Sequence, residues 1–193
     1  LIHPVGRGGF GEVWVCEVVA TSELRALKYL CGEGNPAYLK REWEAVVRYR
    51  EALRQLHSPH LLALEHLNRR GDGFFYTMQL SDGLHAGDPR RPCWQPHTLR
   101  AEVERRRAGE NWFSPEEIRS IIGSVAAAAR ALASAGLVHR DIKPDNLLYV
   151  GGRICLADMS LLDEDAPLLS GRGTSGYAPP SWYRDPGCNP DMW

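Results

Sequence analysis

Apolar and polar positions alternate in short runs over most of the first eighty residues, a pattern that indicates strands rather than helices. Several of these runs are rich in Val and aromatic residues, and turns containing Gly separate them. The predicted strands are residues 1–5, 12–19, 25–30, 61–67 and 74–80. Short turns between consecutive strands favour antiparallel pairing, so the pattern predicts a small antiparallel sheet.

One segment in this half of the chain changes to helical periodicity. Between residues 35 and 57, apolar side chains recur at steps of three and four, and Pro36 lies near the start. The periodic positions are Leu39, Trp43, Val46, Val47, Leu53 and Leu56. We therefore predict one long helix beside the sheet.

The remainder of the chain is mainly helical by the same criterion. Residues 82–97 are rich in Gly, Pro and Arg and predict a loop that marks the boundary between two lobes. A basic helix is expected at 98–107, and Ser114-Pro115-Glu116-Glu117 is a capping box that opens a helix through Ala135. The buried stripe predicted for this helix is Ile118, Ile121, Ile122, Val125 and Leu132. Residues 147–150 and 153–157 predict a hairpin turning at two glycines.

Composition fits a globular chain and narrows the partners. Of 193 residues, 44% are hydrophobic and 24% charged, and the net charge of -1 gives no case for binding nucleic acid or an anionic membrane. The basic run 105–107 is best explained as a solvated helix face. Five scattered cysteines without a Cys-x-x-Cys pair indicate free thiols in a reducing compartment. No apolar run reaches the roughly twenty residues of a membrane span.

The segment from His139 to Asn146, His-Arg-Asp-Ile-Lys-Pro-Asp-Asn, combines three chemically useful groups in a loop stiffened by Pro144. Asp141 can accept a proton from a hydroxyl, Lys143 can neutralise a moving phosphoryl group, and Asn146 can hold a divalent cation. These eight positions together resemble the catalytic loop of protein kinases. The resemblance implies phosphoryl transfer from ATP.

A glycine-rich connection, Gly6-Arg7-Gly8-Gly9-Phe10-Gly11, joins the first two predicted strands. It opens a β-branched run rather than a helix, so it indicates a hairpin over phosphates and not a dinucleotide fold. It resembles the glycine-rich loop of protein kinases, which implies that Gly6, Gly8 and Gly11 approach phosphates and that Val13 packs on adenine.

The third predicted strand carries Ala26-Leu27-Lys28, which resembles the Ala-x-Lys of the kinase family. The resemblance implies that Lys28 contacts phosphates, that Ala26 lines the adenine pocket, and that a helix glutamate pairs with Lys28. Two candidates exist. Glu42 shares a face with apolar residues, whereas Glu44 shares one with Arg48, so we choose Glu42. The helix is expected to run about two turns longer than is usual in the family.

The same resemblance assigns residues around the adenine and the metal. Met78 takes the gatekeeper position, the backbone of Gln79 and Ser81 binds the base, and Leu148 lies beneath it. Asp158-Met159-Ser160 resembles Asp-Phe-Gly, which implies that Asp158 and Asn146 bind Mg²⁺ or Mn²⁺. Met159 can fill the apolar slot of Phe, but Ser160 lacks the conformational freedom of Gly.

Residues 161–170 are expected to begin the activation segment, and Gly173-Thr174-Ser175-Gly176-Tyr177-Ala178-Pro179-Pro180 resembles the end of one. The resemblance implies that Thr174 bonds Asp141 and Lys143, and that Arg140 pairs with a phosphate on Ser170 or Thr174. Pro180 replaces the glutamate of the family pattern. Asp191-Met192-Trp193 resembles the start of the central helix of the large lobe.

Together these features predict an α+β, two-lobed protein-kinase-like fold: a small antiparallel β lobe with one long helix, and a mainly α large lobe that is incomplete. We expect the small lobe at 1–81, a hinge and linker insertion at 82–97, and part of the large lobe at 98–193. The chain resembles bacterial, eukaryotic-like serine/threonine protein kinases. The resemblance covers about three quarters of such a domain, so we expect the segment alone to be poorly stable and weakly active.

The partners implied are ATP, a protein with Ser or Thr, and a second copy where autophosphorylation requires a dimer. The expected location of the domain is cytoplasmic, with a membrane tether in a longer parent left open. Two alternatives stand beside this hypothesis. A pseudokinase scaffold is supported by Ser160 and Pro180. A small-molecule kinase is opposed by the combination of Arg140, Lys143 and Gly-Thr-x-x-Tyr.

Overall fold

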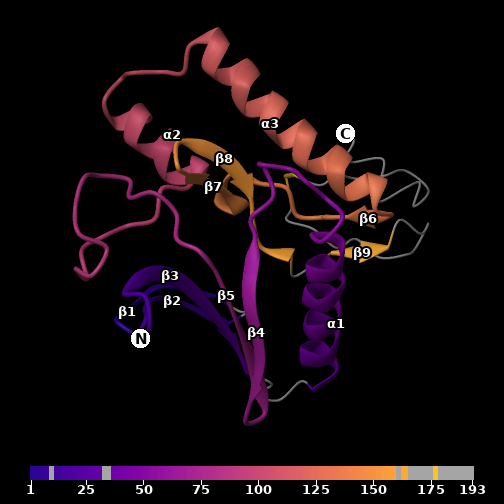
Figure 1. Ribbon diagram of the computed structural model, residues 1–193. Coiled ribbons are helices and arrows are strands. Elements are labelled where there is room, and N and C mark those ends of the chain that lie inside the picture. The colour runs from indigo at the N-terminus through magenta and orange to yellow at the C-terminus, as the bar shows by residue number, and fades with distance from the viewer. Residues whose placement is uncertain (9–10, 32–35, 160–161, 165–175, 178–193) are drawn as a thin grey trace.

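The first half of the chain forms a five-stranded antiparallel sheet (Figure 1). The computed structural model describes residues 1–8, 11–31, 36–159, 162–164 and 176–177. The strands are β1 (His3–Gly8), β2 (Gly11–Val18), β3 (Glu23–Leu30), β4 (Leu64–Arg70) and β5 (Gly73–Gln79). Their order is β1-β2-β3-β5-β4, so β5 lies inside the sheet and β4 at its edge. The predicted antiparallel sheet is confirmed.

Two of the strands, β1 and β4, differ from their predicted ranges by more than two residues at an end. β1 begins at His3 and continues to Gly8, because the glycine-rich residues still pair with β2. β4 begins at Leu64 rather than at residue 61, because Leu61 leaves this sheet and makes an isolated bridge to Leu156. Both differences come from partners that lie outside the local pattern.

Helix α1 (Pro36–Ala52) packs on one face of the sheet, as Figure 1 shows beside β4. Trp43 meets Phe74 edge to face with ring centroids 5.3 Å apart, and Val46 is buried in the same core. The predicted end of this helix at residue 57 is wrong, because the helix ends at Ala52 and a turn follows. Leu53 still packs on the core from that turn, which explains why its position fitted the helical period.

Two helices, α2 (Leu99–Ala108) and α3 (Pro115–Ser134), build the described part of the large lobe. The predicted capping box is present, with Glu117 N–H donating to the Ser114 hydroxyl at 3.2 Å and Ser114 N–H donating to the Glu117 carboxylate at 2.7 Å. In Figure 1, α3 crosses above the short strands of this lobe. Neither helix is long and apolar enough to cross a membrane, and the same holds for α1.

The buried stripe predicted for α3 is only partly correct. Leu132 is fully buried, and Ile121 and Val125 pack partly buried against the core. Ile118 and Ile122, however, are 46% and 61% exposed among the described residues. The alanines face the core instead, because their small side chains let the helix approach the β7–β8 hairpin closely.

The hairpin of β7 (Leu147–Val150) and β8 (Arg153–Leu156) separates two hydrophobic cores. Side chains alternate across a strand, so Ile154 and Leu156 face the large-lobe core while Cys155 faces the core under the sheet. Gly151 and Gly152 both have positive φ, 57° and 74°, as a two-residue hairpin turn of type I′ requires. This confirms the predicted hairpin.

Two short strands were not predicted. β6 (Leu137–Val138) pairs antiparallel with β9 (Asp163–Glu164), so the start of the expected activation segment is held against the residues that precede the catalytic loop. Two-residue strands leave no periodic signal, which explains the omission. Together the sheet, the helices and the hairpin make a two-lobed, protein-kinase-like fold with the predicted α+β content.

Candidate nucleotide-binding and active site

A cavity of about 190 Å³ lies between the sheet and the β7–β8 hairpin. Strands β1, β2 and β3 contribute one group of its lining residues, β5 and the following hinge a second, and the catalytic loop and hairpin a third. The lining comprises Val5, Gly6, Val13, Ala26, Lys28, Tyr76, Met78, Gln79, Leu80, Ser81, Trp94, Pro96, Asp145, Asn146, Leu148, Ala157 and Asp158. Segments far apart in the chain therefore enclose one mostly apolar cavity with a few polar groups, the usual form of a small-molecule site.

Most residues predicted to contact adenine lie in this lining. Val13 and Ala26 are neighbours on paired strands, with Val15 opposite Ala26 in the register, and Leu148 comes from the hairpin of the large lobe. Met78, 8% exposed, stands opposite Ala26 on β5. The structure thus brings these predicted residues to one cavity, and their roles toward a base stay predictions.

Lys28 reaches the polar end of the cavity from β3. Its Nζ donates to Asp158 Oδ1 at 2.5 Å, across 130 residues of sequence, although the lysine side chain is only 7% exposed. A buried ammonium group needs a charged partner, because burying it unpaired would destabilise the fold by the full free energy of its desolvation. The pair therefore ties the small lobe to the residue predicted to bind metal.

The carboxylates around Lys28 keep it charged. Burial lowers the pKa of Lys28, but the ionised forms of Tyr76, Asp158 and Glu42 outweigh burial and raise that pKa above its ordinary value. Burial raises the pKa of Tyr76 to about 12, so this phenol is neutral at neutral pH. The carboxylates alone thus hold Lys28 as an ammonium ion, the form that a phosphate would attract.

The structure separates the two candidate glutamates of α1. Glu42 is 2% exposed, and its charge acts on Lys28. Glu44 points to the surface, where its carboxylate lies 3.9 Å from Lys40 Nζ in a pair of side chains 49% and 77% exposed. This placement favours Glu42 as the residue that orients Lys28.

The catalytic loop is anchored by a buried histidine. His139 is fully buried, its Nδ1 accepts from Asp141 N–H at 3.2 Å, and its Nε2 therefore donates to Ala157 O at 3.0 Å. The next residue, Arg140, has a φ of 65°, a conformation that is rare for a residue with a side chain. The loop is thus bent sharply at Arg140, and the backbone around Asp141 is fixed to the segment before Asp158.

Three polar side chains of the loop converge as predicted from their spacing. Lys143 Nζ lies 2.8 Å from Asp141 Oδ2, and Asn146 Nδ2 donates to both the backbone oxygen of Asp141 at 2.8 Å and its Oδ2 at 2.9 Å. Pro144 opens a single 3-10 turn that ends at Asn146, the place where proline costs no hydrogen bond. Asp141 is therefore held in one orientation by a cation and an amide.

Asn146 and Asp158 fit a divalent cation by their chemistry and by their position. Both line the cavity, and Ala157 N–H donates to Asn146 O at 2.8 Å, which fixes their backbones side by side. Oxygen ligands of this kind suit Mg²⁺, which commonly takes one or two protein groups together with substrate phosphates. Asp158 has a φ of 62°, so its carboxylate is presented from a strained backbone.

The hairpin between β1 and β2 requires glycine at position 11 for a structural reason, besides the predicted approach to phosphates. Gly11 has a φ of 119°, and a side chain there would collide with the backbone carbonyl of Tyr29 on β3. Gly6 lines the cavity and Gly8 pairs with Gly11 across the hairpin. Residues 9 and 10 lie outside the described part of the chain.

Several lining residues were not predicted. Val5 and Leu80 flank predicted positions, while Trp94 and Pro96 come from the linker at 82–97, where no periodicity exists to guide an assignment. The signal available was that Trp94 is the one Trp, Tyr or Phe residue in this Gly-, Pro- and Arg-rich loop.

Other predictions fall on residues that the structure does not describe. These are Ser160, Ser170, Thr174 and Pro180, together with the motif at 191–193. Met159 is described, and it is buried in the large-lobe core, as expected for a residue in the slot of Phe. The four described cysteines, Cys16, Cys31, Cys93 and Cys155, are free thiols.

A glycine hairpin, a strand lysine paired with an aspartate and a His-Arg-Asp loop beside one cavity are together typical of the protein kinase family. In agreement, a family model described as "Protein kinase domain" matches residues 1–193, and the chain belongs to that family.

Curated relatives come from bacteria and eukaryotes. The chain is 29% identical over 161 residues to the serine/threonine-protein kinase PknD of Chlamydia muridarum, covering 82% of the chain and 16% of that protein. It is 29% identical over 181 residues to G protein-coupled receptor kinase 2 of Drosophila melanogaster, covering 91% and 23%. For calcium/calmodulin-dependent protein kinase type 1B of Rattus norvegicus the identity is 28% over 183 residues, covering 91% and 47%. The chain thus spans less than half the length of each of these relatives.

Proposed function

We propose that this chain is the catalytic part of an ATP-dependent serine/threonine protein kinase that uses Mg²⁺. The observation that carries the proposal is that Lys28, Asp158 and Asn146 line one cavity, with Lys28 paired to Asp158. Asn146 in turn bonds Asp141, which pairs with Lys143. Membership of the kinase family and the names of the relatives support it.

In this proposal the side chains have the following roles. Lys28, kept cationic by Glu42 and Asp158, binds phosphate oxygens of ATP. Asp141, oriented by Asn146, positions and deprotonates the hydroxyl of Ser or Thr, and Lys143 offsets the negative charge of the transferred group. Bound Mg²⁺ would neutralise charge on the phosphates, and Asn146 and Asp158 would hold it.

Phosphate transfer from labelled ATP to a generic basic protein and to the protein itself tests the proposal. Asp141→Asn keeps the size of the side chain but removes the base, so we expect a rate at least about a hundredfold lower with nucleotide binding retained. Asp72→Asn, at an exposed turn between β4 and β5, is the matched control and should leave the rate unchanged. Equal rates for wild type and Asp141→Asn would refute the proposal.

A second pair of variants separates a kinase from a binding module. Lys28→Met removes the buried ammonium and should reduce both nucleotide affinity and transfer, whereas Lys40→Met removes a lysine that is 77% exposed and should change neither. Wild-type protein that binds ATP with Mg²⁺ but transfers no phosphate to any hydroxyl would favour the pseudokinase alternative.

A further inference from the structure

The linker at 82–97 is a closed loop with its own hydrogen bonds. Its two ends run together, since His97 N–H donates to Asp82 O at 2.8 Å and Leu84 N–H donates to Gln95 O at 3.0 Å. Gly83 and Pro96 form a β-bridge between these ends. The loop therefore has the form of a compact Ω-loop, a type that packs on its own side chains.

Trp94 is the packed centre of this loop. The side chain is buried, with 7% of its surface exposed, and it lines the nucleotide cavity together with Pro96. A Cβ added at Gly83 would lie 2.6 Å from Trp94 Nε1 and 2.8 Å from His85 O. Gly83 is thus required by the close approach of the indole, which means that the loop holds the ring in one position.

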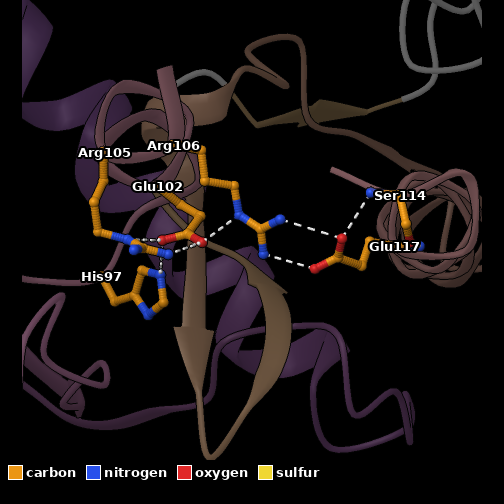
Figure 2. Close-up of polar contacts among 6 residues, drawn as sticks. All are labelled: His97, Glu102, Arg105, Arg106, Ser114 and Glu117. Atoms are coloured by element: carbon orange, nitrogen blue, oxygen red, sulfur yellow. Dashed lines mark hydrogen bonds and ion pairs between the residues drawn. The ribbon is translucent and has the colours of Figure 1, made fainter. Parts of the chain in front are cut away.

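The large lobe anchors the loop at its C-terminal end. The His97 ring stacks on Tyr149 with centroids 4.0 Å apart and planes at 20°, and its Nε2 lies 3.1 Å from Glu102 Oε2. Glu102 Oε1 lies 2.7 Å from Arg105 Nη2 and 2.6 Å from Arg106 Nε. Figure 2 shows Glu102 between these two arginines.

The same contacts continue into α3. Arg106 Nη2 reaches Glu117 Oε1 at 2.6 Å, and Glu117 accepts from the N–H of Ser114 at the start of that helix (Figure 2). The two described helices of the large lobe, α2 and α3, therefore support the end of the loop that carries His97, three residues after Trp94.

The small lobe contacts the tip of the same loop. His3 Nε2 lies 2.9 Å from Pro89 O, and the imidazole is buried, with the residue 7% exposed. Arg90 Nη2 lies 3.3 Å from Glu17 Oε2 on β2. The linker thus contacts both lobes, and its buried tryptophan lies against the cavity between them.

We propose that Trp94 is a nucleotide-contacting residue that recognises the base and ribose of the bound purine nucleotide. This inference rests on the proposed function, because it takes the cavity as the ATP site. An indole offers a flat aromatic face and no charge, so it stabilises a purine ring by stacking and apolar contact and contributes nothing to phosphates. The linker then adds to the base affinity that the other lining residues supply, and Lys28 contributes to phosphate affinity.

Titration calorimetry of the whole protein with ATP, adenosine and tripolyphosphate, each with Mg²⁺, tests this division. For Trp94→Ala we expect Kd for ATP and for adenosine to rise about tenfold, while Kd for tripolyphosphate stays within twofold. Trp94→Phe keeps an aromatic face and should lose at most about threefold. The matched control is Trp112→Ala, because Trp112 is 62% exposed and away from the cavity lining, and it should bind all three ligands as wild type does.

A second variant, Gly83→Ala, keeps Trp94 but displaces its indole ring. Gly83→Ala introduces the Cβ that collides with the indole, so Kd for ATP and adenosine should rise at least about threefold with Trp94 still present. Circular dichroism and the melting midpoint of each variant establish folding. If Trp94→Ala does not fold, Gly83→Ala decides the question by the same three ligands.

The outcomes separate this inference from the proposed function. Wild-type protein that binds none of the three ligands would refute the nucleotide site itself. Wild-type binding with unchanged adenosine affinity in Trp94→Ala and Gly83→Ala would refute only the role of Trp94. An equal loss for adenosine and tripolyphosphate would mean that Trp94 merely supports the fold of the cleft, and it would also overturn the inference.

Discussion

Replacing Glu102 by Gln should destabilise the protein in a manner that depends on pH. Glu102 is 4% exposed and its carboxylate accepts hydrogen bonds from Arg105 and Arg106 and contacts His97 (Figure 2). The bond from Arg105 is the largest cause that lowers the pKa of Glu102 from 4.5 to about 2, against the opposing effect of burial. Glutamine keeps the size of the side chain and removes the charge.

The size of the effect follows from that pKa. Lowering the pKa of Glu102 by about 2.5 adds roughly 3 kcal/mol to the free energy of unfolding at pH 7, at 1.36 kcal/mol per pKa unit. Solvent screens part of it, because the Arg105 side chain is 43% exposed, so we expect about 2 kcal/mol at pH 7. The pKa is lowered in the folded state, so the stabilisation is complete above pH 4.5 and is lost as the pH falls toward 2. By the linkage relation, the gap between wild type and Glu102→Gln should narrow by about 0.8 kcal/mol between pH 7 and pH 4.

Urea unfolding followed by circular dichroism at pH 7, 5 and 4 measures this gap. The control is Glu116→Gln on α3, whose carboxylate pairs with Arg119 at 2.7 Å but is 71% exposed, so its removal should lower stability only slightly at each pH. A gap for Glu102→Gln that is constant or that widens as the pH falls would show that the charge of Glu102 does not stabilise the fold.

Three further substitutions test other parts of the structure. Tyr49→Phe removes the hydroxyl that donates to Leu62 O at 2.7 Å in a fully buried position, and should cost about 1–2 kcal/mol in urea unfolding; a cost near zero would contradict that bond. Gly11→Ala should lower both the melting midpoint and phosphate transfer, because its Cβ would meet the carbonyl of Tyr29; unchanged values would refute the hairpin geometry. Asp82→Ala removes the acceptor of two N–H groups at the β7–β8 turn, at 2.9 and 2.8 Å, and should cost about 1 kcal/mol, whereas full stability would argue against that cap.

The sequence could predict the helices and strands whose own residues show a helical or alternating pattern. Periodicity located α1, the capping box located the start of α3, and alternation located the sheet, because each depends on neighbours along the chain. The catalytic loop was visible because its three polar residues lie within six positions and Pro144 limits the backbone. Local rules therefore predicted the sheet, the main helices and this part of the site.

The remaining features depend on contacts between distant residues. Ile118 and Ile122 fit the apolar stripe of α3, yet the described residues cover the alanine side of that helix instead. Trp94 lies in a loop without periodicity, and only the fold brings it to a cavity whose lining residues range from Val5 to Asp158 in the sequence. Burial of this kind is decided by tertiary packing, which a single sequence pattern does not encode.

The β7–β8 hairpin connects the cavity, the linker and Asp158, which lie far apart in the sequence. Its Leu148 lines the cavity, its turn amides bind Asp82 at the start of the linker, and the chain that leaves it carries Asp158 to Lys28. Ala157 links this chain segment to the catalytic loop, because its N–H donates to Asn146 O and its oxygen accepts from the ring of His139.

The relative position of the catalytic loop and Asp158 is therefore set by hydrogen bonds to the backbone of Ala157, and not by the side chains of Asp141 and Asp158. Under the proposed function, Asp141→Asn should accordingly lower phosphate transfer at least about a hundredfold while leaving the cleft assembled, so adenosine binding and phosphate transfer can be tested separately.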